Sequence, residues 1–224
     1  DVSQSLSSGV QWLLSQQNID GSFGNELDAI PLLTAEAIIA LQTQPNTELQ
    51  VASAIDFLNN YIPTDNDYSS RILFATENNT FLQDILDSHN SDGGWGLLSG
   101  FDSDPQDTAR ALQALKAVNY PDQNAIYSAI NYLKSNQNLD GGWAFRQAQG
   151  AELQESNVYM TALVSMTLQQ FSQTTTLATA INKATSYLIA HQNIDGGFGD
   201  SPSTVYETSL AYIALVGVIT DNTV

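Results

Sequence analysis

The chain has 224 residues, of which 42% are hydrophobic and 9% aromatic, a composition typical of a folded globular protein and not of a disordered one. Asp and Glu number 24 while Lys and Arg number 6, for a formal net charge of −18. Such a surface repels nucleic-acid phosphates and anionic lipid headgroups, and the lack of cysteine excludes disulfides and thiolate metal ligands.

Apolar periodicity and turn signals predict an all-α chain of about five helical hairpins. The longest apolar run, Leu210 to Ile219, is too short to cross a bilayer, so we expect no membrane insertion. Two histidines are too few for a histidine-rich metal site, and we expect neither a metal nor a cofactor. The ten expected helices lie near residues 4–17, 32–43, 49–60, 68–77, 80–89, 106–117, 123–136, 157–171, 176–191 and 204–219.

Four of the first helices of these hairpins end in one shared pattern, Gln/His-Asn-x-Asp followed by small residues and an aromatic. An aliphatic residue stands seven positions before each Asp, and a small or aromatic residue stands eleven positions before it. Because these two residues are four apart, they share one face of a helix. Glycines then accept the positive φ of a sharp exit, and we expect the aromatic to anchor the turn. The copies cover residues 17–24, 89–96, 137–144 and 192–199, and an eroded fifth copy surrounds Asp65.

The second helices of the hairpins carry a Thr-Ala or Thr-Ser pair followed by a leucine seven residues after the threonine. They are rich in apolar residues on several faces, which predicts burial on two sides, whereas the first helices carry their apolar residues on one face. Since no hairpin buries its apolar stripe alone, neighbours must stack, and Ala-rich inner helices favour closure into an α/α toroid with inner and outer helix rings. We expect one such domain over residues 1–224, with Leu41, Leu115, Leu168 and Leu215 in its core.

The repeated Gln-x-x-Asp-Gly-Gly-Trp-Gly pattern resembles the QW repeat of squalene and hopene cyclases, shared more loosely by protein prenyltransferase β subunits. It is also similar to complement-type thioester domains and cobalamin-carrying toroids. The resemblance implies that the repeat residues are structural ties between outer helices. A sugar-stacking platform built from Trp95 and Trp143 is the alternative. The residues concerned are Gln17, Gln137, Gln192, Trp95, Trp143, Phe23 and Phe198.

The acid motif of the cyclases, Asp-x-Asp-Asp-Thr-Ala, has a broken counterpart at residues 102–109. Pro105 and Gln106 split the acidic cluster, and Gln106 stands where the family's protonating Asp directly precedes the last Asp. The simpler interpretation is structural: Asp102 or Asp104 caps the helix and Asp107 complements its dipole, as Glu207 does in the last hairpin. Contact with a cation or ligand is a third possibility.

For other activities that the resemblance suggests, the chain lacks the required residues or domains. The squalene-type cavity lies between two barrels and this chain provides one, while prenyltransferase zinc and thioester chemistry both need cysteine. Polysaccharide lyases and glycoside hydrolases on the same toroid remain possible. Arg71 and Arg110 are expected either to pair with acidic helix starts or to bind an anionic ligand. The candidate groups on inner-helix starts or loops are Asp102, Asp104, Asp107, Arg110, Arg146, Glu155, Tyr159, Tyr206 and Glu207, and their spacing singles out no catalytic pair. All of them except Arg146 are the ligand-binding candidates.

These observations favour a non-catalytic extracellular toroid module, part of a larger secreted or surface protein, that binds a ligand or a protein partner. The alternatives are a divergent terpene-cyclase-like enzyme acting on a polyprenyl substrate and a carbohydrate-active enzyme. An extracellular or periplasmic location is expected from the Lys-poor, Asn/Gln-rich composition, with Asp1 interpreted as the start of a mature domain.

Overall fold

The computed structural model describes residues 2–145, 154–171, 175–200 and 202–221, and within them it contains ten α-helices, one short 3₁₀ helix and no strand. The predicted helical content and order are confirmed. The elements are α1 (Val2–Ser15), α2 (Ile30–Leu41), α3 (Glu48–Asn59), α4 (Asn66–Thr76), η1 (Asn79–Phe81), α5 (Leu82–Asp87), α6 (Pro105–Ala117), α7 (Gln123–Ser135), α8 (Val158–Gln169), α9 (Thr175–Ala190) and α10 (Val205–Asp221).

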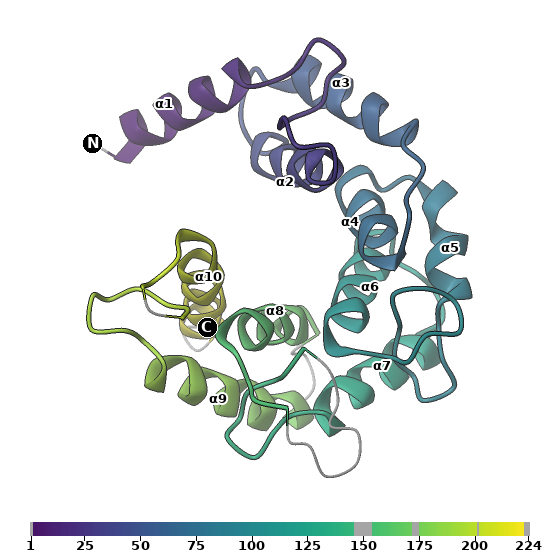
Figure 1. Cartoon of the computed structure of the whole chain (residues 1–224), viewed down its shortest axis with the longest axis vertical. Coiled ribbons are helices and arrows are strands. Elements are labelled where there is room, and N and C mark those ends of the chain that lie inside the picture. Colours follow the sequence, from purple (N-terminus) through teal and green to yellow (C-terminus); the bar gives the residue numbers. More distant parts are fainter. Residues whose placement is uncertain (1, 146–153, 172–174, 201, 222–224) are drawn as a thin grey trace. The chain divides into compact units, whose positions relative to one another are not determined.

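The helices, which are labelled in Figure 1, group into two compact units. Unit 1 comprises Asp1–Asp87 with Ala114–Tyr120, and unit 2 comprises Ser88–Gln113 with Pro121–Val224. Within unit 1, α2 packs against α3 and α4, and α4 packs against α5. Within unit 2, α8 packs against α9 and α10. Consecutive second helices therefore contact one another in each unit, as expected of stacked hairpins.

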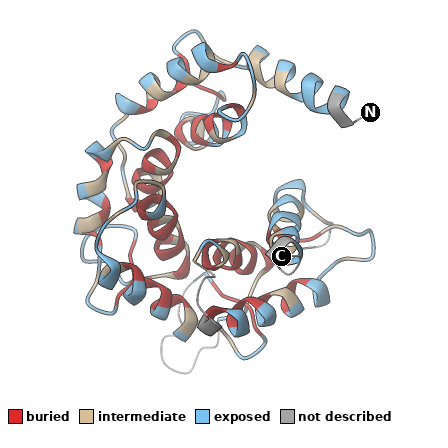
Figure 2. Cartoon of the chain, turned by 180° about the vertical axis from the view of Figure 1, so that it is seen from behind, coloured by how far each residue is buried: buried red, intermediate tan, exposed pale blue. Residues whose placement is uncertain are grey.

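The second helices α2, α4, α6 and α8 are each buried more completely than the first helix of their hairpin, as predicted, but α10 departs from this rule, since only Ala211 and Ala214 are buried among its described side chains. In α8, nine of the 12 residues are buried, whereas α7 buries five of 13, all on one side of the helix. Figure 2 shows this contrast between α8 and its neighbours α7 and α9. Leu41, Leu115 and Leu168 are at most 1% exposed, and Leu215 packs partly buried against the core between α8, α9 and α10.

Each complete repeat ends in a turn whose first glycine has a positive φ, between 84° and 93°. The turn also approaches the first helix of the next hairpin closely. A Cβ on Gly141 would lie 2.6 Å from the carbonyl oxygen of Lys183 in α9. Glycine is therefore required at this position both by the backbone conformation and by the space available.

The aromatic residue after the glycines is an anchor, as predicted. Trp95 and Trp143 are fully buried. The indole Nε1 of Trp143 donates to the carbonyl of Leu133 at 2.7 Å, and its backbone N–H donates to the Thr161 hydroxyl at 3.1 Å. The same backbone bond recurs in every complete copy, which explains why each second helix carries a threonine. The pairs are Phe23–Thr34, Trp95–Thr108, Trp143–Thr161 and Phe198–Thr208.

Two repeat glutamines join consecutive hairpins. The side-chain amide of Gln17 donates to the carbonyl of Gly21 in its own turn and to that of Gln50 in α3. Gln137 makes the equivalent bonds to Gly141 and to Ala180 in α9, both at 2.9 Å. Because a backbone carbonyl accepts each bond, the tie does not depend on the side chain of the next helix.

The aspartate of each repeat holds its turn together. Its Oδ1 accepts the backbone N–H two residues later and the hydroxyl of a serine, at distances of 2.7–3.0 Å. At Asp20, the hydroxyl and the N–H of Ser22 lower the carboxyl pKa from its ordinary value of 3.8. At Asp195, the Ser203 hydroxyl and the Gly197 N–H lower the pKa in the same way. Hydrogen bonds to the ionised form favour that form.

The lowered pKa predicts how these turns respond to acid. Since the folded pKa of Asp20 lies below its unfolded value, the stabilisation is present at neutral pH and is lost as the pH falls below about 4. We expect the free energy of unfolding of the wild type to decline more steeply below pH ~4 than that of Asp20→Asn. Urea unfolding at several pH values measures this difference, and Asp195→Asn should repeat it in unit 2. Parallel profiles for all three proteins would contradict the turn's electrostatic role.

Candidate ligand-binding surface

The acidic cluster before α6 is built as a helix cap. Asp104 accepts the backbone N–H of Asp107 at 2.9 Å, and its own N–H donates to the carbonyl of Trp95 at 3.0 Å. Pro105 begins the helix, where its missing N–H costs nothing. Of the two capping candidates, Asp104 is therefore the cap, and Asp102 is exposed in the loop before it.

The same cap recurs at the equivalent position of the later repeats. Asn157 accepts the N–H of Met160 at the start of α8, and Thr204 accepts the N–H of Glu207 at the start of α10. Glu207 returns a bond, since its Oε2 accepts the Thr204 hydroxyl at 2.8 Å. Asp, Asn and Thr occupy this position in the three repeats. All three side chains offer an acceptor oxygen to the N–H groups of the helix start, so the position has a structural capping role.

Asp107 and Gln106 lie in the first turn of α6. Asp107 is buried, with 2% of its surface exposed, whereas Gln106 is partly exposed. Arg110 is one turn further along, and its Nη1 donates to the Gln113 side chain at 3.2 Å. Gln113 in turn donates to the Thr167 hydroxyl of α8 at 2.9 Å, which joins two second helices through a buried polar contact.

Arg71 follows the structural expectation. It is 7% exposed, its Nε lies 2.8 Å from Asp67 at the start of α4, and its Nη1 lies 3.2 Å from Glu36 of α2. A largely buried guanidinium held by two carboxylates serves to neutralise charge within unit 1.

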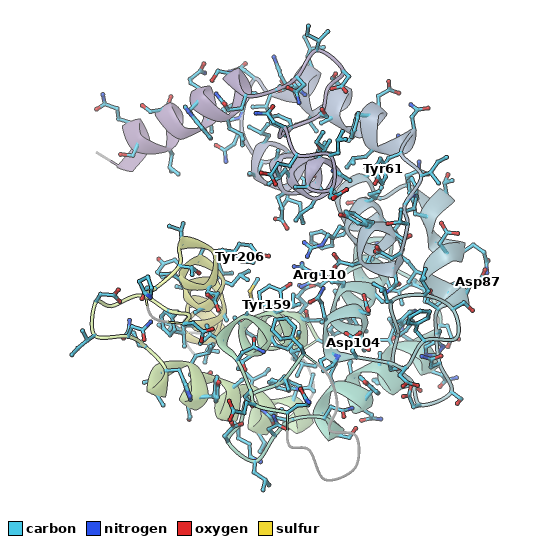
Figure 3. The ribbon with its side chains drawn as sticks, in the orientation of Figure 1. Tyr61, Asp87, Asp104, Arg110, Tyr159 and Tyr206 are labelled. Atoms are coloured by element: carbon cyan, nitrogen blue, oxygen red, sulfur yellow. The ribbon has the colours of Figure 1, made fainter. Side chains whose placement is uncertain are left out.

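Two of the candidate tyrosines come together. The ring of Tyr159 stacks on that of Tyr206, with centroids 5.8 Å apart and planes inclined by 27°. The ring of Tyr159 also stacks on that of Phe145, at 5.8 Å and 22°. Figure 3 shows Tyr159 and Tyr206 extending from α8 and α10. We call Phe145, Tyr159 and Tyr206 the aromatic stack; its end rings, Phe145 and Tyr206, are 54% and 51% exposed.

The repeat explains part of this arrangement. Tyr159 and Tyr206 each stand two residues before the threonine of their helix, and Gln106 holds the same position in α6. Repeat register thus places equivalent side chains at the starts of three second helices. Phe145 was not among the sequence candidates; it lies two residues after Trp143, just beyond the anchored turn.

Negative charge gathers near the segment leading into α8. The hydroxyl of Tyr187 donates to the carbonyl of Ser156 at 2.8 Å. Burial raises the pKa of Tyr187 to about 12, with further contributions from the carboxylates of Asp140, Glu155 and Asp200. Glu155 itself is exposed. The remaining candidate, Arg146, falls outside the described residues.

The sequence profile of the squalene-hopene cyclase C-terminal domain matches residues 101–216, more than half of the chain. The chain belongs to this family. The match runs from the acidic cluster through the aromatic stack into α10, so it contains the candidate ligand-binding residues within the family domain. No curated protein sequence matches the chain. No described helix is both long and apolar enough to cross a membrane.

Solved structures show the fold of this family member. The ent-copalyl diphosphate synthase from Streptomyces platensis superposes with a TM-score of 0.63 at 19% identity, covering 85% of this chain and 39% of the synthase. A polysaccharide lyase gives 0.72 at 13% identity, covering 99% and 86% of the two chains. The protein geranylgeranyltransferase-I of Candida albicans, complexed with GGPP, gives 0.61 at 18% identity, covering 98% and 78%. The fold is therefore the predicted α/α toroid, and the chain spans about two fifths of the synthase.

Proposed function

We propose that this chain is a non-catalytic, ligand-binding domain of the squalene-hopene cyclase family, carried by a larger secreted or cell-surface protein. The observation that carries the proposal is the start of α6. Gln106 directly precedes Asp107, where the resemblance to the cyclases expects the protonating carboxyl, and the neighbouring Asp104 is engaged as the helix cap. A glutamine amide has no proton to give at ordinary pH, so the acid step of cyclisation has no donor at this position.

The proposal retains a binding role because the chain keeps an exposed recognition surface. The aromatic stack presents half-exposed rings, and partly exposed polar groups stand at the equivalent helix position in α6 (Gln106) and directly after Tyr206 (Glu207). Rigid aromatic side chains with few polar partners are characteristic of binding sites. The Lys-poor, Asn/Gln-rich composition, with six basic residues in 224, supports placing the domain outside the cytoplasm.

One observation favours a second candidate function. Asp107 is 2% exposed, so it is the one carboxyl among Asp102, Asp104 and Asp107 that the structure buries. A divergent cyclase that uses Asp107 as its acid would act on a polyprenyl substrate by protonating a double bond. The two functions differ in whether substrate is turned over.

Product analysis separates them. Purified protein incubated with squalene or geranylgeranyl diphosphate, at neutral and mildly acidic pH, should return both compounds unchanged. A cyclised product formed by the wild type and lost in Asp107→Asn would overturn the proposal and establish the enzyme. Asp107→Asn keeps the shape of the side chain, so a loss of product would report on the acid and not on packing.

A further inference from the structure

We propose that the aromatic stack binds an uncharged oligosaccharide chain. This inference rests on the proposed binding function and names its ligand class. It concerns Phe145, Tyr159 and Tyr206, together with the polar groups at the starts of α6 and α10.

The shape of the stack suits an extended ligand. Neighbouring centroids are 5.8 Å apart in both pairs, with inclinations of 22° and 27°. Because aromatic rings in direct face contact lie closer than this, at about 3.5–4.0 Å between carbon atoms, each ring must be displaced sideways relative to the next. Part of each ring face therefore remains uncovered, and the three rings form two offset pairs that share Tyr159. Three partly open faces fit consecutive units of a chain.

The exposure of the end rings distinguishes the stack from the core. Phe145 and Tyr206 are about half exposed, whereas the anchoring Trp143 two residues before Phe145 is fully buried. A hydrocarbon ligand gains most from a closed apolar pocket that removes it from water. A sugar instead has apolar C–H faces, which pack on aromatic rings, and a rim of hydroxyl groups, which remain hydrated or bond to polar side chains. Half-exposed rings match the second kind of ligand.

Polar groups at the equivalent starts of the second helices can satisfy those hydroxyls. Gln106 holds the same helix position as Tyr159 and Tyr206, and its amide both donates and accepts. Glu207 follows Tyr206 directly and is partly exposed. The tyrosine phenol groups add further donor and acceptor atoms.

Charge selects among glycans. Glu155 lies four residues before Tyr159 and Glu207 directly follows Tyr206, and the whole chain carries −18. A uronate-containing chain would be repelled by this field. An organic cation would be attracted by it, but aromatic sites hold such a cation most strongly when several ring faces surround it. Here the inner faces of the stack partly cover one another, which favours the uncharged chain.

Calorimetric and NMR titrations with cellohexaose, maltohexaose and laminarihexaose test the proposal. We expect saturable binding of at least one of them, with a dissociation constant between about 10 μM and 1 mM. Tyr206→Leu should weaken this binding at least about fivefold, because it removes one ring of the stack. Tyr206→Phe keeps the ring and should stay within about twofold of the wild type. Tyr212→Leu is the matched control, since Tyr212 lies on the same helix, is 66% exposed and is outside the stack.

Three results would overturn the proposal. One is the absence of saturation by all three hexaoses at about 10 mM. Another is equal loss of binding in Tyr206→Leu and Tyr212→Leu. The third is tighter binding of choline or hexagalacturonate than of any uncharged hexaose. Turnover of squalene or geranylgeranyl diphosphate tests the proposed function separately, so a protein without turnover that binds no hexaose contradicts the ligand class alone.

Discussion

Replacing Trp143 by alanine is expected to lower the free energy of unfolding by about 3–5 kcal/mol. The indole is fully buried, so its removal leaves a large cavity, and the carbonyl of Leu133 loses the donor that lies 2.7 Å away. The variant also releases the turn that joins α7 to the segment before α8, because the indole is the anchor of that turn.

Urea unfolding followed by far-UV circular dichroism measures this effect. Trp12→Ala provides the matched control, since Trp12 is 64% exposed on α1 and its removal should change the stability by less than about 0.5 kcal/mol. A loss below about 1 kcal/mol in Trp143→Ala would contradict the anchoring role of the repeat aromatic.

Gly141→Ala is expected to destabilise the protein by about 3 kcal/mol or more, the second large effect. Its φ of +93° penalises any side chain by roughly 1–2 kcal/mol, and the new methyl would meet the Lys183 carbonyl oxygen at 2.6 Å. That oxygen belongs to the backbone of α9, so relief requires the turn and the next hairpin to move apart.

Gly196 is the internal control for this experiment. It holds the same repeat position with a φ of +84°, but a Cβ there would meet no atom within 4 Å. Gly196→Ala should therefore show the backbone penalty alone, about 1–2 kcal/mol. Equal losses in the two variants, measured by the same urea titrations, would show that the close approach between turn and helix contributes nothing.

The repeat made most of the fold predictable from the sequence. The glycines of each turn, the buried aromatic and the apolar second helices all follow from local spacing, and the structure confirms them. The expected helix over 80–89 is the clearest departure. Asn78 accepts the N–H of Thr80 and starts a 3₁₀ turn over Asn79–Phe81, so the α-helical part is confined to Leu82–Asp87. A local side-chain hydrogen bond sets this boundary, and apolar periodicity does not predict such a bond.

The candidate site was predictable only in part. Tyr159 and Tyr206 share one repeat position, so the sequence contains the signal that brings them together. Phe145 joins them from a loop whose path depends on the anchored turn before it, and no periodic pattern places it there. The Arg71 pair with Glu36 spans two helices and is likewise a product of packing.

The stability of Asp104 variants tests most directly whether the acidic cluster is scaffold or chemistry. Asp104 caps α6 through the Asp107 N–H, as Asn157 caps α8 through the Met160 N–H. We therefore expect Asp104→Ala to lose about 0.5–2 kcal/mol at pH 7, and Asp104→Asn to remain within about 0.5 kcal/mol of the wild type. A group maintained for catalysis commonly costs stability, and its removal then stabilises the fold. If Asp104→Ala unfolds at a higher urea concentration than the wild type at pH 7, the interpretation of the cluster as a structural cap is wrong.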